Sequence, residues 1–246
     1  MTTALCALAV GQVQPARPEF DVAAITPHPG LSNNIGIQPL PGGKLVVEFC
    51  SLRDLIRSAW AVQTWQIAGG PQWIGSDRYD IQAKAEGNPT PDAMTGPMLQ
   101  ALLEDRFRLV FHHETRQLPA YELTVPRAAK LRPSNGDACA PDPSRKPCGF
   151  HGFGIDGPNR RLEMTGATMA ELAEVLSRSE LRRTVIDKTG LAGRFDISMA
   201  WAIDGPSQDL ATIFTAVQEQ LGLKLEPTKG PVDVLVIDRA EKPSAN

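Results

Sequence analysis

The chain has little of several features that would point directly to a function. Among its 246 residues are four cysteines, four histidines and 6% aromatic residues, and its formal net charge is -3. A charge so close to zero gives no basic field for nucleic acid and no acidic tail. No run approaches the roughly 18 apolar residues that a membrane-spanning helix needs. We therefore expect no nucleic-acid partner and no transmembrane span.

The sequence also lacks the common catalytic and phosphate-binding motifs. It has no Gly-x-Ser-x-Gly nucleophile elbow, no His-Glu-x-x-His helix and no Gly-Lys-Ser/Thr phosphate loop. The adjacent His112 and His113 fall in a predicted strand, where neighbouring side chains point to opposite faces and cannot readily share one metal ion. His151, in the glycine-rich "CGFHGFG", is expected in a loop, with a metal ligand or general base as the alternative. We expect no cofactor, no metal and no catalytic residue.

Cysteine usage points to an oxidising compartment. Cys139 and Cys148 bracket "CAPDPSRKPC", a proline-rich polar segment without helical or strand periodicity. Two cysteines so close in such a loop favour a local disulfide, with two free thiols as the alternative. Cys50 ends an apolar strand and is expected to be a small buried hydrophobe.

The N-terminus resembles the end of a secretory signal. Residues 4–12 read "ALCALAVGQ", a short apolar stretch with a small-x-small cleavage pattern over Ala9, Val10 and Gly11. The basic region of a signal peptide is absent, because the first arginine is Arg17. The alternative is an apolar tail. We expect residues 1–17 to be signal-peptide-like or disordered, and the protein to be secreted or periplasmic.

The first half of the chain alternates strand and helix patterns. Ser51 and Asp54 have the spacing of a capping box, and apolar residues repeat at helical spacing after them. A helix is expected from Pro97, and two strands joined through residues 117–119 are expected to pair after it. The expected strands are 18–27, with a loop after them to Gly43, then 44–50, 78–85, 108–116 and 120–125.

The second half repeats this order. Thr168 and Glu171 have capping-box spacing at the start of a helix, and Gly222 stands at the C-cap of the last one. The closing strands are expected to pair around "TKGP". The expected strands are 160–166, 183–190, 193–201, 223–227 and 232–238, with helices over 168–179 and 210–221.

The two halves can be aligned at their basic–aromatic–Asp–Ile motifs, "RYDI" and "RFDI". We expect a glycine-containing corner in which the aromatic enters the core and the Asp bonds backbone N–H groups. A corner that returns a strand to its sheet must occur once per module, whereas a catalytic loop need not. The corner residues are Tyr79, Asp80, Gly190, Gly193, Phe195 and Asp196.

These patterns predict an α+β fold of two tandem duplicated modules, each β-α-β-α-β-β. Each would have a small mixed or antiparallel sheet packed on paired helices. The alternative is a chance similarity of two α+β halves. The expected modules span residues 18–133 and 159–246, and residues 134–158 form a Pro/Gly-rich loop with the disulfide.

Four segments carry a resemblance to a known family. "FDVAAITPH", "MLQALLEDRFRLVFHHETRQLPAYELTV", "VIDKTGLAGRFDISMAW" and "QEQLGLKLEPTKGPVDVLVIDRAEKPS" resemble the large paralogous family of unknown function expanded in soil acidobacteria. The resemblance covers nearly the whole chain from Phe20. It implies a secreted protein without an established activity, because members typically carry a signal peptide. Related domains are fused to beta-lactam-sensor-type metallopeptidases.

The second module has a more distant resemblance. The layout of "MAELAEVLSRSELRRTVIDKTGLAGRFDISM" and "LATIFTAVQEQLGLKLEPTKGPVDVLVI" is similar to the short N-terminal domain of secretins and TonB-dependent receptors. The cap of the second helix reads Gln220-Leu221-Gly222-Leu223 and lacks that family's threonine. The resemblance implies a periplasmic interaction module with no catalytic residues to transfer.

We therefore expect an exported, non-catalytic binding or protein-interaction protein of the cell envelope. Its partner would be an envelope protein or an extracellular ligand. The strand "VDVLVID" is a candidate edge for β-augmentation. One alternative is a secreted hydrolase with its site between the modules near His151, and another is a sensor domain of metallopeptidase-linked signalling. The tryptophans are candidate binding aromatics, with burial in the core as the alternative: Trp60, Trp65, Trp73 and Trp201.

Overall fold

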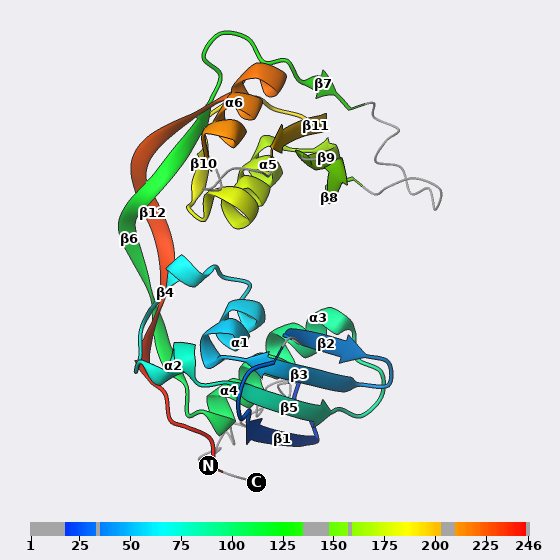
Figure 1. The fold of residues 1–246 in the computed structure, drawn as a ribbon, viewed down its shortest axis with the longest axis vertical. Coiled ribbons are helices and arrows are strands. Elements are labelled where there is room, and N and C mark those ends of the chain that lie inside the picture. The colour runs from blue at the N-terminus through cyan, green and yellow to red at the C-terminus, as the bar shows by residue number, and fades with distance from the viewer. Residues whose placement is uncertain (1–17, 33–34, 135–147, 157–158, 203–209, 245–246) are drawn as a thin grey trace, which may run out of the picture. The chain divides into compact units, whose positions relative to one another are not determined.

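The computed structural model describes residues 18–32, 35–134, 148–156, 159–202 and 210–244. Helices and small antiparallel or mixed sheets alternate along the chain, which confirms the α+β class (Figure 1). Contacts divide the chain into two compact units, Met1–His112 with Val236–Asn246, and His113–Leu235. This division follows contacts rather than chain order, so the tandem modules over 18–133 and 159–246 stay a prediction.

The first unit is built on a four-stranded antiparallel sheet in the order β1-β5-β3-β2. The expected strand at 44–50 is confirmed over its full length. Its side chains alternate between buried and more exposed positions as far as Glu48, and the alternation breaks at Phe49, where the register with β5 shifts. The strands are β1 (Val22–Pro27), β2 (Gly36–Leu40), β3 (Lys44–Cys50) and β5 (Tyr79–Lys84).

Helix α1 (Leu52–Ala59) begins where its capping box predicts. The Ser51 hydroxyl accepts the N–H of Asp54, whose carboxylate accepts the N–H of Ser51 in return, so two otherwise unpaired donors are satisfied. The remaining helical segments of this unit are η1 (Thr64–Gln66), α2 (Trp73–Ser76), α3 (Pro91–Ala93), η2 (Met94–Met98) and α4 (Leu99–Arg106).

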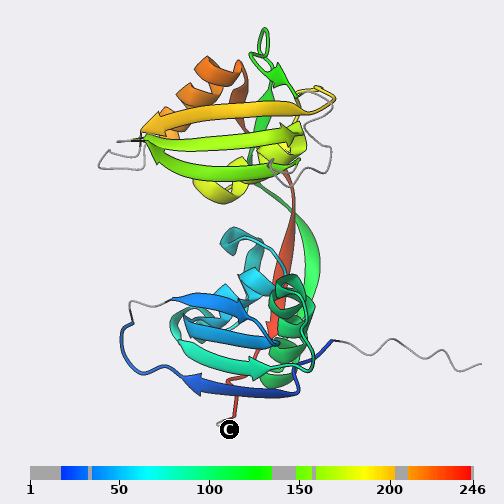
Figure 2. The same cartoon turned by 90° about the vertical axis from the view of Figure 1, so that its right-hand side faces the viewer.

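The second unit also contains a four-stranded sheet, in the order β7-β11-β9-β8 (Figure 2). Its first helix begins at the predicted capping box of Thr168 and Glu171. The strands are β7 (Arg132–Pro133), β8 (Phe150–Asp156), β9 (Asn159–Ala167) and β11 (Phe195–Ala202), and the helices are α5 (Met169–Leu176), η4 (Ser177–Leu181) and α6 (Leu210–Leu221).

The third sheet, in the order β10-β6-β12-β4, shows that the two predicted strand pairs are wrong. The expected strands 108–116 and 120–125 are one continuous strand, and so are 223–227 and 232–238. Neither connecting segment, 117–119 or 228–231, is a tight two-residue hairpin turn. β10 pairs in parallel with β6, and Gly70 beside β4 donates its N–H to Ile237 of β12. The strands are β4 (Ile67–Gly69), β6 (Val110–Thr124), β10 (Val185–Asp187) and β12 (Lys224–Arg239).

Two strands were missed because glycine and proline obscure them. β2 lies inside the expected loop before Gly43, and β8 lies inside the expected loop 134–158. His151 is therefore a strand residue and not a loop residue. Residues 135–147 and 157–158 of that segment, with Cys139, lie outside the described part of the chain.

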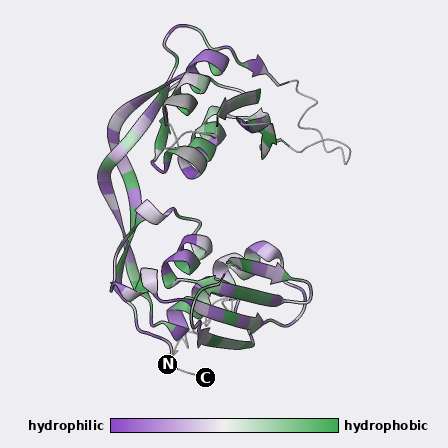
Figure 3. Ribbon diagram, in the orientation of Figure 1, coloured by the Kyte–Doolittle hydropathy of each residue, from purple (hydrophilic) through white to green (hydrophobic). Residues whose placement is uncertain are grey.

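Apolar residues on the sheets and helices form the core of each unit (Figure 3). Apolar residues at helical spacing in and after α4 and α6 are buried, except Phe111, which is half-buried. Their burial agrees with an amphipathic helix leading into a strand in each unit. The buried set is Leu99, Leu103, Phe107, Leu109, Ile213, Val217, Leu221, Leu223 and Leu225.

Candidate functional site

The two Asp residues of the predicted corners hold backbone N–H groups. Asp80 accepts the N–H of Phe49 at 2.9 Å, and Asp196 accepts the N–H of Gly166 at 2.9 Å. The second oxygen of Asp80 lies 2.7 Å from Nδ1 of His28. The preceding aromatics differ in depth, because Tyr79 is fully buried and Phe195 is partly buried against the second core.

The arginine before each corner aromatic ties the corner to a helix that lies earlier in the chain of the same unit. Arg78 donates to the carboxylate of Asp54 at 2.9 Å, and Asp54 is the third residue of α1. Arg194 donates to the carbonyl of Gly166 at 2.6 Å and contacts Glu171, the third residue of α5. These polar groups are engaged in hydrogen bonds and ion pairs that hold the fold.

The glycines of the second corner have the backbone that glycine favours. Gly190 and Gly193 have φ of 66° and 103°, and a Cβ at either would meet open space. In the first corner, Gly75 lies inside α2 without a positive φ. The two corners therefore share the Asp contact rather than the glycine geometry.

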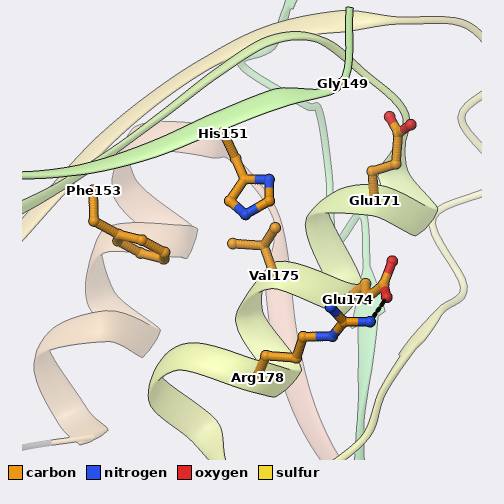
Figure 4. Close-up of a pocket in the computed structure, with 7 residues that line it drawn as sticks. All are labelled: Gly149, His151, Phe153, Glu171, Glu174, Val175 and Arg178. Atoms are coloured by element: carbon orange, nitrogen blue, oxygen red, sulfur yellow. Dashed lines mark hydrogen bonds and ion pairs between the residues drawn. The ribbon is translucent and has the colours of Figure 1, made fainter. Parts of the chain in front are cut away.

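A pocket of about 470 Å³ lies in the second unit between β8 and α5 (Figure 4). His151 and Phe153 come from β8, and Gly149 immediately precedes it. The opposite wall is formed by Glu171, Glu174 and Val175 of α5 and by Arg178 of η4.

The apolar part of this pocket is an exposed continuation of the core. Phe153 stands opposite Leu162 of β9, so the two side chains share the core face of the sheet. Phe153 is nevertheless 43% exposed, whereas Val175 across the pocket is 8% exposed. The Phe153 ring meets the buried Trp201 edge-on at 6.5 Å, and Arg160 lies 5.7 Å from its centre. The ring is thus held in place with one side open to solvent.

The carboxylates in the pocket are already paired. Glu171 accepts the N–H of Thr168 at 2.7 Å and contacts Arg194, while Glu174 forms an ion pair with Arg178 one turn along. Figure 4 shows the His151 imidazole above Val175, with the Glu171 carboxylate turned away from it. Within the described chain, His151 has no acidic partner that would orient it as a general base.

The remaining histidine pairs do not converge. His112 lies 3.0 Å from Asp238, and His113 lies 2.8 Å from a different carboxylate, Asp233. Across the described ranges, no group of three or more His, Cys, Asp or Glu side chains is placed to hold a metal ion.

The four candidate tryptophans are not brought together into one surface. Trp60 packs edge-on against Phe111, and Trp73 stacks on Phe107 with Lys242 over its face. The Trp65 Nε1 is buried without a hydrogen-bond partner. These three belong to the first unit, and Trp201, 6% exposed, belongs to the second core.

Cys50 is buried at the end of β3, as expected for a small hydrophobe. Burial, and then the nearby Asp54 carboxylate, raise the pKa of its thiol. A raised pKa lowers the thiolate fraction, so Cys50 is a poor nucleophile. The predicted partner of Cys148 lies outside the described residues, so the Cys139–Cys148 disulfide stays a prediction.

The pocket residues Phe153, Val175 and Arg178 were not predicted from the sequence. The signal that was available is the alternation His151, Phe153, Ile155 with glycines between, which is typical of a strand with one populated face. The expected edge strand was "VDVLVID", which belongs to β12; β12 lies between β6 and β4 in its sheet, whereas β8 is at an edge.

Comparisons with known proteins identify a family but no function. Neither the curated proteins nor the solved structures contain a match to the chain. No helix in the described part of the chain is long and apolar enough to cross a membrane. The family described as "Protein of unknown function (DUF3738)" matches residues 53–240, from the start of α1 past the end of β12, including both walls of the pocket. The chain belongs to this family.

Proposed function

We propose that the protein is a non-catalytic protein-interaction module that binds a peptide segment of its partner at the pocket between β8 and α5. The observation that carries the proposal is the half-exposed Phe153 ring over the buried Val175, beside a sheet edge. An aromatic that is rigid on one side and solvent-exposed on the other is typical of binding hot spots. The volume lies within the roughly 300–1,000 Å³ of ligand pockets.

Among the described residues, the usual edge-protecting devices are lacking at the sheet edge where the pocket lies. Proteins guard sheet edges with proline, charge or very short strands. The edge strands β1, β2 and β7 each contain a proline, Pro27, Pro39 and Pro133 respectively. On β11, the Gln220 amide bonds both the N–H and the carbonyl of Ala200, and so occupies part of that strand. Within the part of the chain that the structure describes, β8 has neither device over residues 150–155.

The compartment of this interaction is the cell envelope or the exterior. The support is the signal-like residues 4–12 and the predicted Cys139–Cys148 disulfide, both read from the sequence. The partner is then an envelope protein or an extracellular ligand.

A secreted hydrolase is the second candidate, and its supporting observation is that His151 lines the pocket. Against it, the two carboxylates beside His151 are held by other groups, as described above. A general base must lie within hydrogen-bond distance of the proton that it removes, and a histidine base is commonly oriented by an acidic side chain. Binding is therefore the function that the pocket supports best.

Selection from a random linear peptide library on the full chain tests the proposal. Enriched peptides should bind the Phe153→Ser variant roughly tenfold more weakly, since truncating a hot-spot aromatic costs this much or more. Val22→Ser is the matched control, because Val22 is also an exposed apolar residue on an edge strand but lies in the first unit. Peptides that bind both variants equally, or no enrichment at all, would overturn the proposal. Thermal unfolding of each variant verifies that it folds.

A further inference from the structure

We infer that the protein forms a symmetric dimer in which β8 pairs antiparallel with β8 of a second copy. The two sheets of order β7-β11-β9-β8 then join into one sheet at their β8 edges. The inference goes beyond the proposed function, because the partner is the chain itself and no foreign peptide takes part. Both interactions use the same strand edge, so they are tested with different probes.

One face of β8 carries apolar side chains that the chain leaves exposed. Among the described residues of the second unit, the large exposed hydrophobic residues are Phe153, at 43%, and Ile155, at 78%. They lie two residues apart on the strand, so they point to the same face of the sheet. An exposed hydrophobic edge strand is a template for pairing with another chain.

The opposite face of β8 carries glycine. Gly152 and Gly154 alternate with the larger residues of the strand. Gly154 lacks the left-handed backbone that favours glycine, and a Cβ built on it would meet no described atom within 4 Å beyond its chain neighbours. Neither backbone strain nor packing within the described chain therefore explains this glycine. Glycine inside a strand often marks a place where a ligand or another backbone approaches closely.

The charged residues beside these glycines complement those of a second copy. On β9, Arg161 stands opposite Gly154 and Glu163 stands opposite Gly152, and the two side chains form an ion pair at 3.0 Å. When β8 pairs with its copy about Phe153, Gly154 of each chain faces Gly152 of the other. Each Arg161 then lies across two glycines from the Glu163 of the second copy. The two ion pairs thus meet head to tail, as four charges of alternating sign.

The neighbouring registers lack this match. A centre of symmetry at Gly154 places Arg161 across from its own copy, and a centre at Gly152 does the same for Glu163. Like charges disfavour both registers. Pairing about Phe153 also uses all seven residues of β8, because Phe153 is the middle residue of the strand. Charge and strand length therefore select the same register.

On the other face, this register covers the exposed apolar residues. The two Phe153 rings meet at the twofold axis, and His151 of each chain stands opposite Ile155 of the other. Aromatic pairs across strands are favourable. The interface is confined to one strand of each copy, so we expect a weak dimer that dissociates on dilution.

Single cysteines test the pairing and its register by disulfide trapping of the full chain. Opposite residues of antiparallel strands have Cα atoms about 4.5–5.5 Å apart, which is within disulfide reach. Phe153→Cys should therefore give a covalent dimer on mild oxidation. Ile155→Cys is the matched control and should give no more dimer than wild type, because it faces His151 of the second copy. A mixture of the His151→Cys and Ile155→Cys proteins, which both retain Phe153, should give the covalent heterodimer.

Charge reversal tests the match across the glycines. In sedimentation velocity, Arg161→Glu should weaken the dimer about threefold or more, because carboxylates then lie across from each other in both rows. Adding Glu163→Arg to this variant restores the alternating signs and should return the dissociation constant close to that of wild type. Thermal unfolding of each variant verifies that it folds.

Each failure has a distinct meaning. Equal cross-linking of Phe153→Cys and Ile155→Cys, or no heterodimer in the mixture, would overturn the dimer. A double charge variant that dimerises no better than Arg161→Glu would overturn the charge-matched register. If library peptides bind in a Phe153-dependent way but no cross-link forms, this inference is wrong and the binding function stands. If the cross-links form as expected and no peptide binds, the binding function is wrong and the dimer stands.

Discussion

Asp80 accepts the backbone N–H of Phe49, a non-glycine residue whose φ of 51° lies in the left-handed region. Asp196 makes the same bond to Gly166, whose φ is 54°. In both units the carboxylate thus holds the bend between the strand and the N-cap of the following helix. The aspartates of the corners act on the fold, and this accounts for their presence in both halves.

Asp80→Ala should lower the free energy of unfolding by about 2 kcal/mol, because the N–H of Phe49 loses a charged acceptor at a strained position. Urea unfolding followed by circular dichroism measures the change. Glu86→Ala, at an exposed residue after β5, is the control and should stay within about 0.5 kcal/mol of wild type. Equal effects of the two substitutions would show that the carboxylate does not hold the bend.

Two glycines with nearly the same backbone should respond differently to alanine. Gly190 and Gly222 have φ of 66° and 68°, but a Cβ at Gly190 meets nothing, whereas one at Gly222 would lie 2.4 Å from the carbonyl oxygen of Ala128. Gly190→Ala should cost about 1 kcal/mol of backbone strain. Gly222→Ala should cost about 3 kcal/mol, because backbone must also move. Urea unfolding of both variants compares them, and similar losses would contradict the contact at Ala128.

The stability of the protein should fall as the pH rises above 9. Burial, and to a smaller extent a nearby Asp carboxylate, raises the pKa of the Cys50 thiol above 9.0 and that of the Tyr79 phenol above 10.0. A folded-state pKa above the unfolded value stabilises the fold at lower pH and loses this contribution as the pH rises through it. The measurement is unfolding at about pH 8 and about pH 10.5.

Variants at these positions provide the control. Cys50→Ala and Tyr79→Phe remove the two titrating groups, so each should lose less stability between the two pH values than wild type does. An unchanged pH dependence in the double variant would assign the effect to other groups.

The intact mass of the natively produced protein should show both sequence-based predictions about export. Cleavage after Gly11 would leave a chain beginning at Gln12, and reduction would add the pair of hydrogens of one disulfide. The control is the Cys148→Ser variant. Because it cannot form the Cys139–Cys148 disulfide, its mass should be the same before and after reduction. A chain that begins at Met1 or Thr2 and has all thiols free would contradict export.

Local patterns were enough to predict much of the fold. The capping boxes at Ser51 and Thr168 and the helical spacing after them act within a few residues, so α1 and α5 begin where expected. Strand β3 likewise follows from its own alternation. The sequence also indicated that the aspartates of the two corners bond backbone N–H groups, because Asp beside a bend has few other partners.

The sequence alone determined the α+β class and the starts of α1 and α5, since capping boxes depend on contacts between near neighbours. The helix expected from Pro97 was placed wrongly, because the helical segment already begins at Pro91, where the Thr90 side chain caps it. Only the tertiary structure decided that β6 and β12 are continuous and that β8 is an edge strand, because strand partners are chosen by packing far along the chain. The same holds for the pocket. Phe153 and Val175 share no local pattern, and they face each other because β9 sets the position of β8 and the core sets that of α5.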